Sequence, residues 1–193
     1  MTTVIGVDAS LTATGVAIIS PDTAPFADPD PDAPMRAELG TFGSRPTTDT
    51  IRDRSRRHHH LAREVCDLAG IGTADLVVIE APSYGSRDGH AWDRAHVWWM
   101  IVDHALTHSV PVISVPPARV KKFATGKGNA DKTTVAIAVA RLWPDVMPAN
   151  DNEADALALA SIGTALLDVA PFPLLQRHRD VLKDIPQSWK DQL

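Results

Sequence analysis

The spacing of apolar and polar residues predicts a chain in which strands come first and then alternate with helices. Short apolar runs rich in β-branched residues, bounded by turn formers, predict strands over residues 3–8, 14–20, 75–80 and 110–115. Residues 35–42 could form a further strand. Over other segments, apolar residues recur at intervals of three and four, as on one face of a helix. We expect helices over residues 49–68, 90–108, 131–143 and 152–169.

The order of these elements predicts the fold class. The five-residue link between the first two strands favours a hairpin, and the third strand would extend it to an antiparallel meander. Residues 75–80 form a continuous apolar run, typical of a strand buried on both faces, which ends before Pro82. A meander followed by alternating helices and strands favours one α/β domain built on a mixed sheet.

Composition narrows the class of protein. The chain has 193 residues, a net charge of −5 and a single cysteine, Cys66, which excludes a disulfide framework and a cysteine-based zinc site. The longest uncharged apolar stretch, residues 156–167, is far shorter than the ~20 residues of a membrane helix. The N-terminus has no secretory pattern, so we expect a cytoplasmic protein without a membrane segment. The net charge alone disfavours a nucleic-acid partner.

Acidic residues mark the points where chemistry is expected. Asp8 and Glu80 each end a predicted strand, where ligands bind in α/β sheets. Asp155 begins a helix and shares a helical face with Asp151 and Asn152, four and three residues before it. Oxygen donors without His or Cys favour a hard cation such as Mg²⁺ or Mn²⁺. Taken singly, each acid could instead be a turn former, a helix cap or an exposed strand end.

Four motifs occur in one order along the chain. They are GVDASLTATG at residues 6–15, VIEAP at 78–82, VKK and TGKGNADK within 120–132, and ADALALA at 154–160. Together they resemble the motifs of RuvC-type Holliday junction resolvases, or crossover junction endodeoxyribonucleases, over residues 4–166. This resemblance implies an RNase H-like α/β fold, a mixed β-sheet flanked by α-helices. It also implies a nuclease domain over residues 1–170, followed by a C-terminal tail over 171–193.

The resemblance further implies Mg²⁺-dependent cutting of four-way or related branched DNA by a homodimer, with two ions per site and Mn²⁺ as a substitute. It assigns Asp8, Glu80 and Asp155 to the catalytic metal site. The family has an acid or a histidine where this chain has Asn152. Asp151, one helical turn before Asp155, could serve instead, so both residues remain candidates. The acidic loop over residues 22–34 is a further departure, nearer to phage-encoded members, for which the location would be the host cytoplasm.

A basic segment offers a DNA-binding surface despite the negative total. Residues 119–141 contain six basic residues and one acid. The resemblance points to Lys121 and Lys132 as phosphate contacts, and we expect further contacts from Arg119, Lys122 and Lys127. Glycines at 126 and 128 would let main-chain N–H groups approach phosphate. The alternative is a solvated basic helix face.

Aromatic and histidine residues have competing interpretations. Tyr84, in the loop after the Glu80 strand, could stack at the junction centre, and Arg87 nearby could contact the DNA backbone. The tryptophans at 92, 98 and 99 favour core packing, but the adjacent residues 98 and 99 cannot both face one core. The resemblance implies that one of them could lie in a dimer interface, because the corresponding helix does so in the family. Three consecutive histidines at 58–60 diverge by ~100° per residue on a helix and favour a solvated or DNA-facing surface over a metal site. Cys66 is expected to be a buried, small apolar residue.

Three other functions fit parts of the sequence. A broader endonuclease would also cut forks and flaps, and a catalytically weak junction-binding protein would account for Asn152 in place of an acid. An ATP-binding protein of the actin and sugar-kinase type also carries Asp, Ser and Gly on its first hairpin, but that fold needs two such domains and 193 residues supply one.

Overall fold

The fold was obtained as a computed structural model. It describes residues 2–23, 30, 33–45, 50–82 and 90–192. Most of the predicted acidic loop, together with Tyr84 and Arg87, lies outside the described residues. No described helix is both long and apolar enough to cross a bilayer.

A five-stranded mixed sheet forms the centre of the molecule. Its strands are β1 (Val4–Asp8), β2 (Thr14–Pro21), β3 (Met35–Phe42), β4 (Leu76–Glu80) and β5 (Val112–Val115). The order across the sheet is β3-β2-β1-β4-β5. The first three strands pair antiparallel, whereas β4 pairs parallel with both β1 and β5. The predicted meander and mixed sheet are confirmed.

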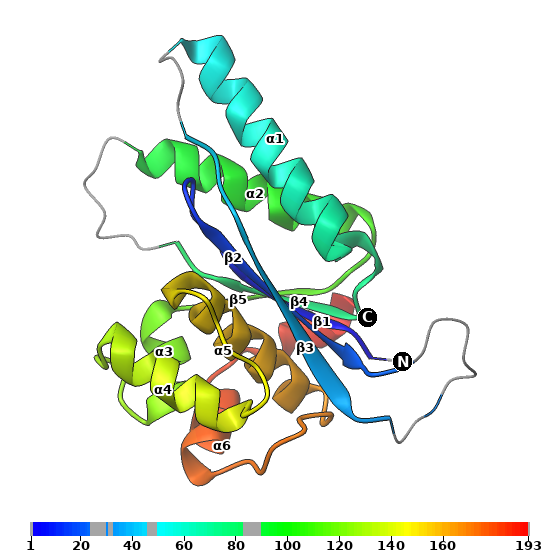
Figure 1. The fold of residues 1–193 in the computed structure, drawn as a ribbon. Helices are drawn as coiled ribbons and strands as arrows, with labels where there is room; N and C mark the ends of the chain where they lie inside the picture. Colours follow the sequence, from blue (N-terminus) through cyan, green and yellow to red (C-terminus); the bar gives the residue numbers. More distant parts are fainter. Residues whose placement is uncertain (1, 24–29, 31–32, 46–49, 83–89, 193) are drawn as a thin grey trace.

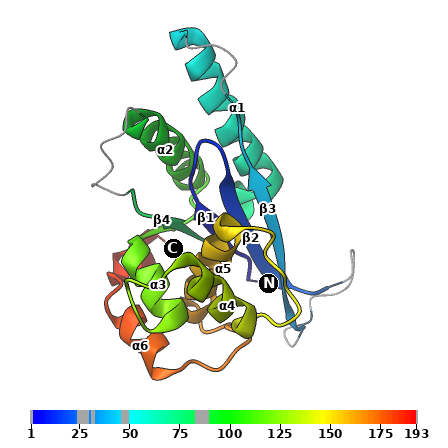
Figure 2. The same ribbon diagram turned by 60° about the vertical axis from the view of Figure 1, so that its left-hand side comes forward.

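Helices cover both faces of the sheet (Figures 1 and 2). One face carries α1 (Ile51–Ala69) and α2 (Ala91–Thr107). The opposite face carries α3 (Pro117–Thr125), α4 (Lys132–Leu142), α5 (Asp151–Leu166) and α6 (Gln176–Lys183). Short 3₁₀ helices follow α1 and α6, at Ile71–Thr73 and Gln187–Gln192.

Side-chain alternation along the strands divides the core in two. Ile5, Val7, Val77 and Ile79 pack toward α1 and α2. Val4, Leu76 and Val78 pack toward α5, where they meet Leu157 and Leu159. Asp8 and Glu80 lie an even number of residues after members of this second set, so both side chains lie on the α5 face of the sheet.

Two glycines allow α5 to lie directly on the sheet. A Cβ at Gly6 would overlap the carbonyl oxygen of Ala156, and one at Gly15 would overlap that of Asn152. Nearly every side chain of the helix from Ala156 onward is buried. The first turns of α5 are therefore held against the ends of β1 and β2.

Two helices were not expected from the sequence. The α3 helix begins at Pro117, two residues after the predicted strand over residues 110–115 ends, and proline is well suited to the first helical turn. The α6 helix and the turn after it lie in the segment expected to be a polar tail. Residues from this segment are buried in the core beneath α5: Phe172, Val181, Ile185 and Trp189. The domain boundary at residue 170 stays a prediction.

The α2 tryptophans do not all pack in the core. The side chains of Trp92 and Trp99 are 86% and 56% exposed, so the expectation of core packing is wrong for both. Trp98 packs at the edge of the core shared with α1, and its ring meets that of Trp99 edge to face at 4.8 Å. Consecutive helical residues point in different directions, which separates their environments.

Candidate active site

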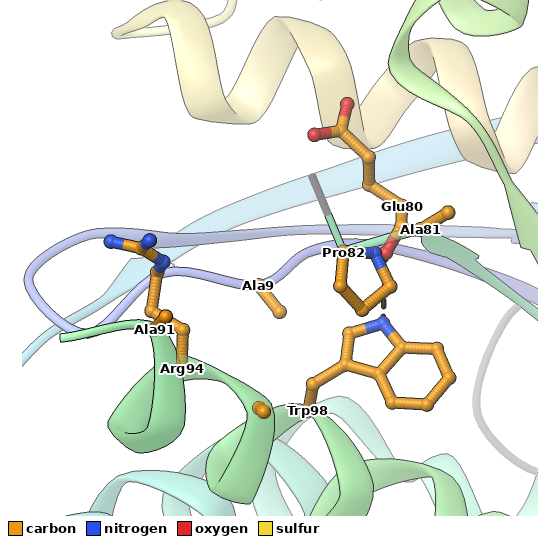
Figure 3. Close-up of a pocket in the computed structure, with 8 residues that line it drawn as sticks. Ala9, Glu80, Ala81, Pro82, Ala91, Arg94 and Trp98 are labelled. Atoms are coloured by element: carbon orange, nitrogen blue, oxygen red, sulfur yellow. Dashed lines mark hydrogen bonds between the residues drawn. The ribbon is translucent and has the colours of Figure 1, made fainter. Parts of the chain in front are cut away.

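Three acidic residues predicted from the sequence come together at one edge of the sheet. β1 and β4 pair with Val7 opposite Ile79, so Asp8 and Glu80 end neighbouring parallel strands. Asp155 lies in the first turns of α5, which contact β2 next to Asp8 because Gly15 is paired with that residue. Glu80 points toward the α5 side of the sheet (Figure 3). The three carboxylates interact electrostatically, although they come from three elements.

The electrostatics of these acids are unfavourable to full ionisation. Burial first, and then the charge of Asp155, raise the pKa of Asp8 to about 7. The pKa of Glu80 rises to about 8, first through burial and then through Asp8 and Asp155. Burial also raises the pKa of Asp155. Three carboxylates held in this way need added positive charge to be ionised together at neutral pH.

This acidic cluster fits a divalent cation in its charge and in its type of donor atom, but the distances between its side chains do not form a coordination shell around one ion. Its donors are all carboxylate oxygens, which Mg²⁺ and Mn²⁺ prefer. In the described part of the chain, however, no three His, Cys, Asp or Glu side chains are arranged so that they could hold one metal ion. The fit therefore rests on the shared electrostatics of the acids rather than on a preformed coordination shell.

The two candidates for a fourth ligand differ in environment. Asp151 is exposed, and its Oδ2 lies 3.4 Å from Lys132 Nζ in an ion pair; its charge also raises the pKa of Asp155. Asn152 is half-buried, with its main chain against Gly15. The choice between Asp151 and Asn152 stays open.

A buried acid that the sequence analysis did not single out holds α5 in place. Glu153 accepts hydrogen bonds from Thr41 Oγ1 of β3 (2.8 Å) and from the main-chain N–H of Ala149 (2.7 Å). Its own N–H donates to Asn150 Oδ1, which caps the helix (3.0 Å). The sequence signal for this role was a glutamate three residues after an asparagine, the capping-box pattern that marks the start of a helix. Glu153 thus fixes the start of the helix that carries Asp155.

Two of the predicted basic residues flank the acidic cluster. Lys132, at the start of α4, lowers the pKa values of Asp8, Glu80 and Asp155. Lys121, on α3, lowers those of Glu80 and Asp155. Lys121 and Lys132 are therefore the lysines of the basic segment whose charges lower the pKa values of the acidic cluster.

The other predicted DNA contacts are placed differently. Lys122 follows Lys121 by about 100° around α3, Arg119 lies on the same helix, and Lys127 is exposed in the loop after it. Two main-chain N–H groups at this loop have partners within the protein, and the expected approach to phosphate stays a prediction. The N–H of Gly126, in the left-handed conformation that ends α3, donates to the carbonyl of Lys122, and that of Lys127 donates to Thr125 Oγ1.

A second polar cluster joins α1 to α2. Arg54 Nη2 donates to both carboxylate oxygens of Asp93 at 2.8 and 2.9 Å, and Nε2 of the buried His58 lies 3.6 Å from Oδ1. His59 and His60 are exposed, so the surface interpretation of the histidine tract holds for these two and not for His58. The cluster borders an open cavity of about 660 Å³ that includes the exposed Trp92 and Trp99 among its lining. Cys66 is buried, as expected.

A smaller pocket adjoins the acidic cluster on the α2 side of β4 (Figure 3). Its volume is about 190 Å³. It is lined by Ala9, Glu80, Ala81, Pro82, Ala91, Arg94, Ala95 and Trp98. Trp98 Nε1–H donates a 2.8 Å hydrogen bond to the carbonyl oxygen of Glu80.

Curated proteins similar to this chain share one description. No protein-family profile matches it. Over 162 residues it is 32% identical to the crossover junction endodeoxyribonuclease RuvC of Rhodopirellula baltica, an alignment that covers 83% of this chain and 84% of the relative. The RuvC of Caldicellulosiruptor saccharolyticus is 28% identical, in an alignment that covers 81% of this chain and 89% of that relative.

Solved structures give the same fold. Thermus thermophilus RuvC superposes with a TM-score of 0.61 at 21% identity, covering 89% of this chain and 99% of that one. The same protein in complex with a Holliday junction substrate gives a TM-score of 0.63 at 23% identity, covering 90% and 100%. The predicted RNase H-like fold is thereby confirmed.

Proposed function

Because the chain belongs to the RuvC family of crossover junction endodeoxyribonucleases, we propose that it resolves Holliday junctions or related branched DNA by phosphodiester hydrolysis at the acidic cluster. The observation that supports this site is the convergence of Asp8, Glu80 and Asp155 from β1, β4 and α5, with Lys121 and Lys132 beside them. A phosphodiester carries a negative charge, and the two lysines attract it to the carboxylates.

The carboxylates are the proposed ligands of divalent cations. RuvC-type nucleases depend on metal ions, and we propose Mg²⁺, replaceable by Mn²⁺, with two ions per site. Asp8, Glu80 and Asp155 would hold the ions, with Asp151 or Asn152 completing the set. When bound, such ions activate water and stabilise the leaving oxygen. The chain itself keeps the carboxylates in place through the β1–β4 pairing and the Glu153 contacts with β3.

Cleavage of synthetic DNA tests this function. A four-way junction should be cut only when Mg²⁺ or Mn²⁺ is present, and faster than a fork or a plain duplex. Asp8→Asn and Glu80→Gln should abolish cutting while junction binding survives, whereas the control Asp145→Asn, an exposed acid in the loop after α4, should cut normally. Mg²⁺-dependent cutting retained by both active-site variants would refute the assignment.

The alternatives predict other outcomes of the same assay. Equal rates on forks and junctions would favour the broader structure-specific endonuclease. Tight junction binding without cutting in any divalent cation would favour the catalytically weak junction-binding protein.

We propose that DNA phosphates are bound by Lys121 and Lys132, with Arg119, Lys122 and Lys127 as neighbours. Tyr84 and Arg87 stay predictions. The double variant Lys121→Ala plus Lys132→Ala should weaken junction binding and flatten its dependence on salt, because fewer counterions are released. The matched control is Lys183→Ala, on α6. Unchanged affinity and salt slope in the double variant would exclude this surface.

A homodimer would place two active sites on a junction with two-fold symmetry. We propose that the exposed Trp92 and Trp99, with Ile51 of α1, form the contact, since large exposed apolar side chains are typical of interaction sites. Sedimentation should give a dimer for the wild type and a monomer for Trp99→Glu. A monomeric wild-type protein would contradict the proposal. A cytoplasmic location also stays a prediction.

A further inference from the structure

The pocket between the end of β4 and the start of α2 has the size of a site for one small group. Its volume of about 190 Å³ is below the ~300–1,000 Å³ of sites that take drug-sized ligands. The pocket therefore suits a single ring system.

The walls of the pocket are apolar, with one cationic side chain. Five lining residues are alanine or proline, and the indole of Trp98 forms a further wall. The indole N–H is already bonded to the carbonyl of Glu80, which holds the ring in place and leaves its carbon surface for contact. Arg94 lies at one side, while the Glu80 carboxylate points away from the pocket (Figure 3). A planar apolar face with a hydrogen-bonding edge matches this lining.

The position of the pocket connects it to the acidic cluster. Ala9 directly follows Asp8, and Ala81 directly follows Glu80, so each strand supplies one residue to the cluster and the next to the pocket. Glu80 belongs to both, through its carboxylate on the α5 side and its main chain on the α2 side. The thickness of one strand separates the two sites.

We propose that this pocket binds one unstacked nucleobase of the nucleotide next to the phosphodiester that is cut. The base would stack on Trp98 and Pro82 and present its edge to Arg94, because bases gain energy from stacking on aromatic rings and arginine recognises base edges. The pocket then acts as a subsite that ties cleavage to the base beside the cut. This inference rests on the proposed function.

Removal of single bases tests the subsite. Four-way junctions carrying one abasic nucleotide at each position around the cut are compared with the intact junction under single-turnover conditions with Mg²⁺. For the wild-type protein, one adjacent abasic position should lower the cleavage rate about tenfold, the order expected for loss of one stacked base.

Two variants show whether that base occupies this pocket. Ala91→Leu fills the pocket, so this variant should cut the intact junction about tenfold more slowly than the wild type does. Its cleavage rate on the abasic junction should be less than about twofold below its rate on the intact junction, because the two changes remove the same contact. The matched control Ala140→Leu, exposed on α4, should keep the full abasic effect. Arg94→Gln should reduce the rate differences among the four bases at that nucleotide, with the exposed Arg63→Gln of α1 as its control.

The outcomes separate the pocket from the function. Abasic effects below about twofold at every adjacent position, or a full abasic effect in Ala91→Leu, would overturn the subsite while junction cleavage stands. A wild-type protein that cuts no junction would refute the proposed function, and the subsite with it. Thermal unfolding of Ala91→Leu checks its folding, and the Arg94→Gln arm decides the question if that variant is unfolded.

Discussion

Replacing Asp8 by asparagine should stabilise this protein at pH 8 when divalent cations are absent, although Asp8 is a proposed catalytic residue. The pKa of Asp8 in the fold is about 7, against an ordinary value of 3.8, mainly because partial burial removes water from its carboxyl group and because the charge of Asp155 is nearby. Between about pH 4 and pH 7 the folded protein holds a proton that the unfolded chain has lost. The free energy of unfolding therefore falls as the pH rises through this range.

The size of the effect follows from the pKa. The difference of about three pKa units, at about 1.4 kcal/mol each, sets an upper limit of about 4 kcal/mol. Asp8 is only half-buried, so solvent screens part of this, and we expect about 1–3 kcal/mol. The wild type is destabilised by this full amount above pH 7. Below about pH 4 the effect is absent, because the Asp8 carboxyl is protonated in both the folded and the unfolded chain.

Urea unfolding at pH 4, 6 and 8 in EDTA measures this difference. Asp8→Asn should be more stable than the wild type at pH 8 and equal to it at pH 4, while the exposed control Asp145→Asn should show no such trend. Adding Mg²⁺ at pH 8 should stabilise the wild type more than Asp8→Asn, since a ligand that binds the folded state raises its stability. A variant that is no more stable than the wild type at pH 8 in EDTA would refute the reasoning.

Two further substitutions test how the site is held. Gly15→Ala should destabilise the fold by about 1–3 kcal/mol and nearly abolish cleavage, because its Cβ overlaps the Asn152 carbonyl and displaces α5. Thermal unfolding measures the loss of stability. The control in that measurement is Gly40→Ala, whose Cβ meets only the ring edge of Phe42. Trp98→Phe keeps an aromatic ring but loses the hydrogen bond to the Glu80 carbonyl, so kcat should fall about tenfold while the affinity for the junction stays unchanged. A parallel loss of affinity would contradict the role of Trp98 in positioning Glu80.

Much of the fold could be predicted from local pattern. The strands β1, β2 and β3 begin and end within about two residues of the predicted segments. For β1 and β2 the reason is that a run of β-branched residues between turn formers needs no distant partner to be recognised. The α3 and α6 helices escaped prediction. The first begins with proline, and the second shows few apolar positions, of which Val181 is buried only through its packing against other helices.

The sequence by itself determined which residues to propose as catalytic, since Asp8, Glu80 and Asp155 lie at strand and helix ends within an ordered set of motifs. Only the tertiary structure decided that they meet. Parallel pairing puts the end of β4 beside that of β1, and the close approach at Gly15 brings α5 over both. Burial and mutual repulsion then raise the pKa values of these acids.

The same distinction applies to the α2 tryptophans and to the nearby pocket. A helical period shows that Trp98 and Trp99 point in different directions, but not which of them meets β4. The pocket is formed where the ends of two strands meet one helix. Local periodicity follows from the chain's own geometry, whereas contacts between distant segments depend on strand pairing and helix packing, which no single segment encodes.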